Sequence, residues 1–237
     1  MQPMTGVERM GNILRRKPVD RIGLYEGFWS DTQQVWTQQG HLREGEHVGD
    51  HFGFDLEILW AFDLTADLDK VPEVVEETEE TILTRDGNGA LLRRHKLHDA
   101  TPEHVDFMVK DRRGWEEYVK PRLTADRRRI KFDAYRAAKE HARQHDRFFA
   151  WAGINVFECM HPMCGHENML MGMALDPDWV RDMVDTYSRV TIELQEILFA
   201  EEGYPDGIWY FEDMGFKGRP FMSPKMYREI VQPAHVR

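Results

Sequence analysis

Short, nearly continuous apolar runs alternate along this chain with longer segments whose apolar residues recur at helical spacing. Residues 54–62, 147–152 and 208–211 have the length and composition of buried strands. Residues 21–28 form another such run, which we interpret as the first strand and its exit. Buried strands that are separated by helices predict an α/β fold with a parallel sheet and outer helices.

The clearest helix is predicted from Asp176-Pro177 to Gly203, because an N-cap residue and a proline begin it and a glycine ends it. Its apolar residues recur at helical spacing and are Val180, Val184, Tyr187, Val190, Leu194 and Leu198. This stripe is expected to pack on a sheet. Further helices are expected over residues 5–16, 29–39, 111–120, 132–144 and 167–175, and from Ser223-Pro224 onward.

The residues Asp86-Gly87-Asn88-Gly89 form a strong turn signal between two arms, 73–84 and 90–97. The first arm, EVVEETEETILT, is too acidic for a strand of a central sheet. We therefore expect residues 72–98 to form a β-hairpin excursion outside the main sheet. Residues 98–108 are interpreted as a connector that follows it.

Composition narrows the classes of partner and compartment. The 237 residues carry a formal net charge of −11, which disfavours nucleic acid and anionic membrane surfaces as partners. Cys159 and Cys164 are too few for a disulfide framework, so nothing requires an oxidising compartment. The longest apolar-rich run, 148–157, is far shorter than a membrane span of about 20 residues. A soluble, cytoplasmic protein is expected.

Acidic side chains follow the predicted strands at their carboxyl ends, where parallel α/β enzymes carry out their chemistry. They are Glu26, Asp63, Glu158, Glu212 and Asp213. Carboxylates that gather in a partly buried site raise one another's pKa, which suits proton donation. They could also bind cationic or pyrrole N–H groups, or a metal ion through water, or simply mark where strands reach the surface. We assign catalytic roles to Asp63, Glu212 and Asp213, and substrate binding to Glu26 and Glu158.

Aromatic side chains gather near the first two predicted strand ends: Trp29, Trp36 and Trp60, with Phe28 and Phe62. Such a group could line a pocket for a flat or methylated ligand, or could belong to the core. We include Trp29 among the candidate substrate-binding residues.

Two histidine-rich stretches raise the question of a metal site. His41, His47 and His51 lie in a polar loop; such loops can bind metal ions, but exposed histidines are usually just solvated. Residues 159–166, CMHPMCGH, hold the ligand types of tetrahedral zinc, yet structural zinc sites use two ligand pairs separated by about a dozen residues. Zinc binding, lining of a substrate pocket and plain packing stay open for this stretch. We assign His161 to substrate binding and no residue as a metal ligand.

Three stretches together resemble one known family: chiefly residues 205–233 (PDGIWYFEDMGF…SPKMYREIVQP), with support from residues 8–24 (ERMGNILRRKPVDRIGL) and 167–190 (ENMLMGMALDPDWVRDMVDTYSRV). The family is the uroporphyrinogen decarboxylase superfamily, which includes cobalamin-dependent methyltransferases such as methylcobalamin:coenzyme M methyltransferase. The resemblance implies a (β/α)8 barrel of the TIM type with the same kind of hairpin.

A complete barrel of this type has eight strands and needs about 250 residues. In this chain we recognise only four barrel strands as far as Phe211. We expect residues 1–237 to be a single barrel domain that is incomplete, the N-terminal part of a longer protein, covering about two-thirds of the barrel. Such a piece leaves an unpaired sheet edge that could pair with another copy of the chain.

The resemblance also implies residue roles. In uroporphyrinogen decarboxylases a strand-end aspartate holds the pyrrole N–H groups of the substrate, and the segment EILWAFDL puts Asp63 in that role. The arginine-rich segment that binds the substrate's carboxylates corresponds to YEGFWSDTQQVW, which has no arginine and carries Glu26 and Asp31 instead. An acidic loop would repel a polycarboxylate porphyrinogen. The methyltransferases hold zinc by a His-x-Cys pair and a later cysteine, which would lie beyond Arg237.

These features favour a corrinoid-dependent methyltransferase that acts on a small thiol or methylated substrate, with the corrinoid carried by a partner protein. The alternatives are a decarboxylase of uroporphyrinogen or a related acid, and an inactive fragment or partner-binding subunit. No cofactor is assigned within the chain itself, and zinc and a corrinoid are expectations for a full-length protein.

Overall fold

The computed structural model describes residues 2–237, which form two compact units. Unit 1 contains Met1–Ala61, Lys131–Gly153 and Leu198–Trp209. Unit 2 contains Phe62–Ile130, Ile154–Ile197 and Tyr210–Arg237. The chain therefore passes repeatedly from one unit to the other, and each unit is described by itself.

The parallel sheet has three strands in the order β1 (Leu56–Trp60), β6 (Phe148–Ile154) and β7 (Gly207–Phe211). β1 and β6 are parallel, with Leu56 beside Phe148 and Trp60 beside Ala152. β7 runs the same way, because Asp206 N–H bonds to the Phe149 carbonyl at the start of β6 and Asn155 N–H bonds to the Phe211 carbonyl at its end. The three predicted strands and their direction are confirmed.

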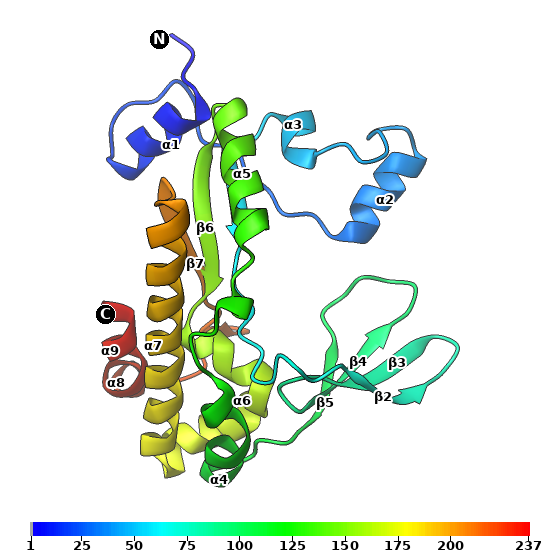
Figure 1. The fold of residues 1–237 in the computed structure, drawn as a ribbon, viewed down its shortest axis with the longest axis vertical. Coiled ribbons are helices and arrows are strands. Elements are labelled where there is room, and N and C mark those ends of the chain that lie inside the picture. The colour runs from blue at the N-terminus through cyan, green and yellow to red at the C-terminus, as the bar shows by residue number, and fades with distance from the viewer. Residues whose placement is uncertain (1) are drawn as a thin grey trace. The chain divides into compact units, whose positions relative to one another are not determined.

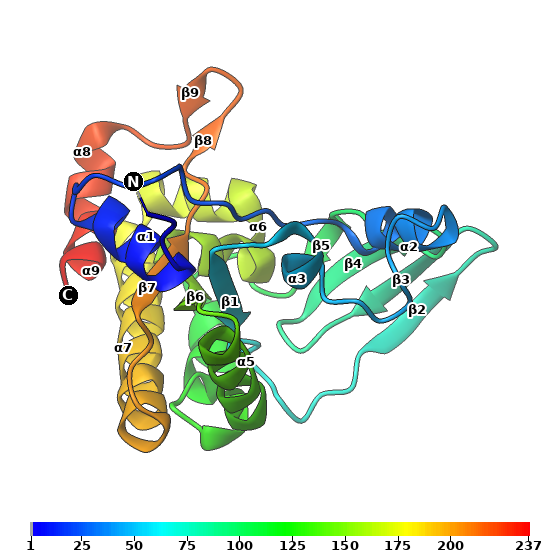
Figure 2. The same cartoon turned by 90° about the horizontal axis from the view of Figure 1, so that it is seen from above.

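Four helices accompany this sheet in unit 1: α1 (Gly6–Leu14), α2 (Ser30–Gln38), α3 (Val48–Phe52) and α5 (Phe132–Gln144). Thr5 caps α1 in a capping box with Glu8, which explains why the helix begins there. α5 runs alongside β6 in both views (Figures 1 and 2), and the Tyr135 ring packs on Phe149 with ring centroids 5.0 Å apart. The residues of β6 from Phe148 to Ala152 are all buried, as expected for the central strand.

Unit 2 contains a four-stranded antiparallel sheet in the order β2 (Glu73–Glu77), β3 (Thr81–Arg85), β4 (Ala90–His95) and β5 (Glu103–Phe107). Around it the chain forms α4 (Arg112–Gly114), the π-helical turn η1 (Trp115–Val119), and the 3-10 turns η2 (Lys120–Arg122) and η3 (Arg127–Arg129). The later elements are α6 (Val156–Leu175), β8 (Gly215–Phe216), β9 (Arg219–Pro220), α8 (Pro224–Met226), η4 (Tyr227–Val231) and α9 (Gln232–Val236).

α7 (Pro177–Glu202) is the long helix of Figure 1 and contains residues of both units. Every residue of its predicted apolar stripe is buried, and Gly203 follows with the positive φ of 75° that ends a helix. Near its carboxyl end, Phe199 packs edge-on against Trp151 of β6. Phe199 lies next to Leu198, the last residue of the stripe, so this end of the helix contacts the sheet, while packing of the whole stripe on a sheet stays a prediction.

The predicted (β/α)8 barrel is wrong. Among residues 2–237 the parallel sheet has three strands, and each outer strand, β1 and β7, has one strand neighbour. A closed barrel needs a partner on both sides of every strand. Residues 21–28, predicted as the first strand, are not a strand: the Leu24 carbonyl accepts a hydrogen bond from Asp55 N–H, but Ile22 is 84% exposed.

Two smaller predictions also need correction. The hairpin across Asp86–Gly89 is present as β3 and β4, but the arm predicted over residues 73–84 is two strands, because the chain turns at Thr78 and returns at Thr81. Residues 98–108 are more than a connector, since β5 lies within them and pairs with β4. The acidic β2 is exposed along its whole length because it is an edge strand of this second sheet.

β7 was predicted as a strand buried on both faces, and it is not. Its apolar side chains Ile208, Trp209, Tyr210 and Phe211 are between 39% and 53% exposed. The reason is its position, because an edge strand lacks the second neighbour that would cover it.

Candidate functional site

Two carboxylate–imidazole pairs lie in unit 2 on the segments that follow β6 and β7. Asn155 leaves β6 and caps α6, because its side-chain oxygen accepts the Val156 N–H at 2.9 Å. This cap places Glu158 in the first turn of α6, and Glu212 comes directly after β7. The carboxyl ends of parallel strands are the usual position for catalytic groups in α/β proteins.

The first pair is Glu158 and His161, one helical turn apart on α6. His161 Nε2 lies 2.8 Å from Glu158 Oε1, and the two side chains are 13% and 15% exposed. The other oxygen of Glu158 accepts the backbone N–H of Asp213. Burial alone would raise the pKa of Glu158, but the hydrogen bond and charge of His161, with the Asp213 N–H, lower it. Glu158 is therefore an ionised carboxylate that orients the His161 ring.

The free nitrogen of His161 is the most informative atom of the site. Nδ1 is buried and has no hydrogen-bond partner among the described residues. Neutral imidazole has one donor and one acceptor nitrogen. If Nε2–H donates to Glu158, Nδ1 carries a lone pair, and no described N–H or O–H group donates a hydrogen bond to it.

The second pair is Glu212 and His235. Glu212 accepts the Phe157 N–H with one oxygen, and its other oxygen lies 2.6 Å from His235 Nε2, although the angles are not those of a hydrogen bond. The Tyr227 hydroxyl lies 3.0 Å from His235 Nδ1. Glu212 is 8% exposed and His235 15%. The Tyr227 hydroxyl and the Glu212 carboxylate thus approach the two ring nitrogens of His235 from different sides.

Two further histidines stack on His161. The ring centroid of His166 is 4.2 Å from that of His161, and His104 of β5 lies 6.0 Å from it on stacked rings. Burial first, and the neighbouring His161 second, lower the pKa of both His104 and His166. Both rings are therefore held in the neutral form over a wider pH range than a free histidine.

This histidine stack is expected to make the protein less stable as the pH falls below about 6.5, the ordinary pKa of histidine. A histidine whose folded-state pKa is lowered binds its proton more readily when unfolded, so its contribution is complete above that pH and is lost below it. Urea unfolding at about pH 7.5 and about pH 5.5 measures how much of the free energy of unfolding is lost between the two pH values. This loss should be smaller for the double variant His104→Phe, His166→Phe than for the wild type. His41→Gln, an exposed position, serves as the control, and an unchanged loss in the double variant would contradict the expectation.

The two cysteines of the stretch 159–166 are buried thiols. Burial, with the charges of Glu212 and Glu158, raises the pKa of Cys159 well above its ordinary value, and burial raises the pKa of Cys164 to about 12. Each sulfur is directed to a backbone carbonyl, of Ile154 and Met160 respectively. Thiolate is the form that binds zinc or attacks a substrate, so this stretch does not fit a zinc site.

Of the residues predicted from the sequence, the structure brings four together: Glu158, His161, Glu212 and Asp213. Asp213 takes part through its backbone N–H, and its side chain is exposed. Asp63 is exposed, and its Oδ1 accepts the Thr65 N–H in its own loop rather than a group of these four residues.

Glu26 and Trp29 are exposed and belong to unit 1, whereas the four residues above belong to unit 2. The sequence prediction missed His104, His166, Tyr227 and His235. His104 was missed because β5 was not recognised. His235 and Tyr227 lie eight positions apart on the final helical turns, a spacing that carries no motif of its own.

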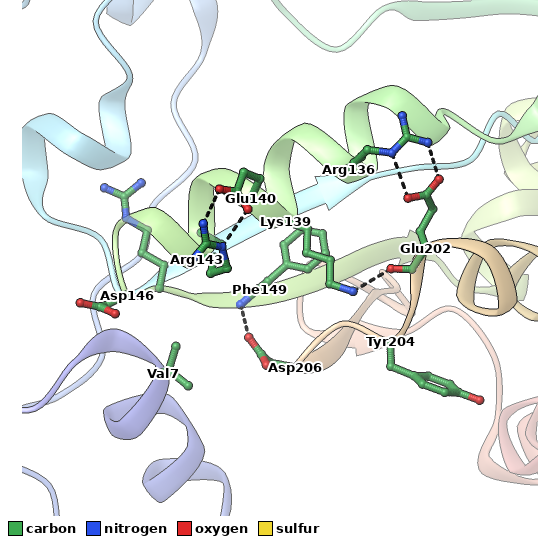
Figure 3. A pocket seen from close by; sticks show the side chains of 12 residues that line it. Val7, Arg136, Lys139, Glu140, Arg143, Asp146, Phe149, Glu202, Tyr204 and Asp206 are labelled. Carbon is green, nitrogen blue, oxygen red and sulfur yellow. Dashed lines mark hydrogen bonds and ion pairs between the residues drawn. The ribbon is translucent and has the colours of Figure 1, made fainter.

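A separate cavity of about 430 Å³ lies in unit 1 beside α5 and the amino ends of β6 and β7 (Figure 3). Its charged side chains bind one another: Arg136 pairs with Glu202 and Arg143 with Glu140, while Lys139 donates to the Glu202 carbonyl. Because these groups are already paired and the cavity lies at the opposite strand ends from the usual catalytic position, we do not assign it a catalytic role.

None of the described helices is both long and apolar enough to cross a membrane. No protein-family model, curated protein or solved structure matches the chain.

Proposed function

We propose that this chain is an acid–base enzyme in which His161 transfers a proton and Glu158 orients its ring. The single observation that supports it is the buried Nδ1 of His161, which lacks a partner while Nε2 is engaged by an ionised carboxylate. An imidazole oriented in this way is a general base at neutral pH. Glu212, with His235 and Tyr227, is the neighbouring group that can return a proton.

Within the classes that the sequence resemblance implies, methyl transfer to a small thiol uses such a base directly. His161 Nδ1 would take the S–H proton, and the resulting thiolate would accept a methyl group. A corrinoid carried by a partner protein would supply that methyl group when bound. The described cysteines do not fit a zinc site, so thiol activation is assigned here to His161 alone.

Decarboxylation of uroporphyrinogen or a related acid is less favoured. That reaction also needs proton delivery, which the same pairs could perform, but its substrate carries many carboxylates. Among the described residues, the partners of Glu158 and Glu212 are histidines and backbone N–H groups, without a guanidinium or ammonium group. An anionic substrate would be repelled at such a site.

A second candidate function is partner binding through the open sheet edge. It is favoured by β7, whose exposed apolar residues lie on an outer strand that has one strand neighbour. Such an edge can add a strand from another copy of the chain, giving a homo-oligomer. This function would need no catalytic residue.

A cytoplasmic location, a small-molecule substrate and the absence of nucleic-acid or membrane partners belong to the same proposal. The two cysteines are free and buried, which is compatible with a reducing compartment. The net charge of −11 disfavours anionic macromolecules as partners.

The test is demethylation of methylcobalamin by the purified chain in the presence of coenzyme M, followed by visible absorbance. The variant His161→Gln is expected to lower the rate by about 100-fold, because a positioned general base contributes at least that much. Glu158→Gln should lower the rate less than His161→Gln does. It should also shift the pH profile of the rate, since Glu158 acts through the imidazole of His161. Glu167→Gln, an exposed residue on the same helix, is the matched control and should leave the rate unchanged.

A wild-type rate that survives His161→Gln would contradict the role of His161. Release of CO₂ from uroporphyrinogen, lost in the same variant, would instead support the decarboxylase. Absence of both reactions, together with a defined oligomer that Trp209→Lys disperses in sedimentation analysis, would favour the partner-binding function.

A further inference from the structure

A second group of titratable side chains lies in unit 1, on elements that the proposed catalytic site does not use. His47 precedes α3, Asp50 lies within α3, Glu57 lies on β1 and His141 lies on α5. We call these four residues the α3–α5 cluster. One ligand atom from each of His47, Asp50 and His141 can be chosen so that all three atoms lie within 4.8 Å of one another.

Each histidine of the cluster has both ring nitrogens next to a carboxylate. His47 Nε2 lies 3.3 Å from Glu57 Oε1, and its Nδ1 lies 3.4 Å from Asp50 Oδ1. His141 Nδ1 lies 3.1 Å from Glu57 Oε2, and its Nε2 lies 3.3 Å from Asp50 Oδ2. The two rings are also close to each other, with centroids 4.5 Å apart.

A neutral imidazole can donate to one of these carboxylates but not to both. When His47 and His141 donate to the two oxygens of Glu57, the remaining nitrogens direct their lone pairs at the negative Asp50. That contact is repulsive unless a cation lies between the groups. The cation is either a proton on each ring, giving two adjacent imidazolium ions, or a metal ion.

The distances around Asp50 are also those expected between ligands of one metal ion. The separations of 3.3 and 3.4 Å exceed the usual N–H···O length of about 2.9–3.0 Å. Each is close to the ligand-to-ligand edge of a tetrahedral site, about 3.3–3.4 Å when the metal–ligand bonds are about 2.0–2.1 Å. The distance from His141 ends at Asp50 Oδ2 and the distance from His47 at Oδ1. The contact between His141 Nδ1 and Glu57 Oε2 is shorter, at 3.1 Å, and this is the nitrogen that we expect to donate a hydrogen bond to Glu57.

Arg147 leaves one Asp50 oxygen available for such an ion. Its guanidinium is 4% exposed and donates to Asp50 Oδ1 at 2.6 Å and to Glu57 Oε2 at 3.1 Å. Among the described residues, the partner of Asp50 Oδ2 is His141. The guanidinium also fixes both carboxylates in place, while His47, 45% exposed, keeps the cluster open to solvent.

We propose that His47 Nδ1, His141 Nε2 and Asp50 bind one divalent transition-metal ion of the zinc class, and that Glu57 accepts the outer N–H of both rings. Carboxylates in this outer position fix the tautomer and orientation of metal-binding histidines. The solvent-exposed side leaves a further coordination position for water or another ligand. This metal site is independent of the proposed catalytic site in unit 2.

Zinc titration of the metal-free full chain by calorimetry at neutral pH tests the site. One zinc ion per chain is expected, with affinity at least 10-fold lower in His47→Gln and in His141→Gln. Glu57→Gln, which keeps one acceptor oxygen but removes the negative charge that both rings and Arg147 face, should weaken binding by about 10–100-fold. Circular dichroism confirms that each variant is folded, and cobalt substitution gives visible bands whose loss in the same variants reports on the ligands directly.

His51→Gln is the matched control, because His51 lies on the same short helix but pairs with Glu46. Cys159→Ser, Cys164→Ser tests the other histidine-rich stretch. Zinc binding that is unchanged in His47→Gln and His141→Gln, or that is lost in the cysteine double variant, would overturn the proposal. Failure of the wild type to bind zinc while both rings titrate as imidazolium ions would also overturn it.

Discussion

Replacing Arg9 with methionine is expected to lower the free energy of unfolding by about 3–5 kcal/mol, the usual effect of removing one partner from a buried ion pair. Arg9 is 4% exposed and lies in α1 of unit 1. Its guanidinium binds both oxygens of Asp20 at 2.7 Å and also pairs with Asp55, whose side chain is 4% exposed. Methionine conserves much of the volume but leaves these two carboxylates without their shared cation.

The matched control for this prediction is Arg21→Met. Arg21 also pairs with Asp55, at 2.5 Å, but its own side chain is 46% exposed. Because an exposed guanidinium is screened by solvent, its loss should cost about 1 kcal/mol or less. Equal effects of the two substitutions in urea unfolding would show that burial does not decide the strength of this network.

The same substitution should change how stability depends on pH. The Arg9 guanidinium, hydrogen-bonded to Asp20, holds the pKa of that carboxyl well below its ordinary value. A lowered carboxyl pKa contributes stability above the unfolded value of about 3.9, and this contribution is lost as the pH falls through the folded value. The difference in the free energy of unfolding between wild type and Arg9→Met should therefore be constant above about pH 5 and narrow as the pH falls from about 4 toward about 2.

Gly165→Ala is expected to destabilise the protein by about 2–4 kcal/mol, from backbone strain together with overpacking. Gly165 interrupts α6 with φ 77° and ψ 154°, a region that residues with a side chain rarely adopt. A Cβ atom at this position would also lie 2.5 Å from Cε2 of Phe107 on β5. The glycine is thus needed both for the kink and for the approach of β5 to α6.

Gly53→Ala is the comparison for that variant, because Gly53 also has a positive φ, of 65°, but open space where its Cβ would lie. Only the conformational cost of about 1–2 kcal/mol should appear there. Gly165 also lies between His161 and His166, so Gly165→Ala should disturb their stacking and reduce activity in the methyl-transfer assay. A Gly165 variant as stable as Gly53→Ala would mean that Phe107 moves aside without cost.

The sequence by itself determined most local structure. Capping residues and apolar spacing located α1, α5 and α7, and the Asp86–Gly89 turn located the β3–β4 hairpin. Three apolar runs identified β1, β6 and β7 as parallel strands. These features depend on neighbouring residues, through backbone sterics, caps and side-chain periodicity, and a short stretch of sequence therefore carries them.

The tertiary structure alone decided how those elements pair. It placed β7 at the edge of a three-stranded sheet, added β5 to a second sheet, and joined Glu158 to the backbone of Asp213 across 55 positions of sequence. It also separated Asp63 from the carboxylates with which it was grouped and brought in His235. Such contacts depend on the sum of many long-range packing terms, and no local pattern of residues contains them.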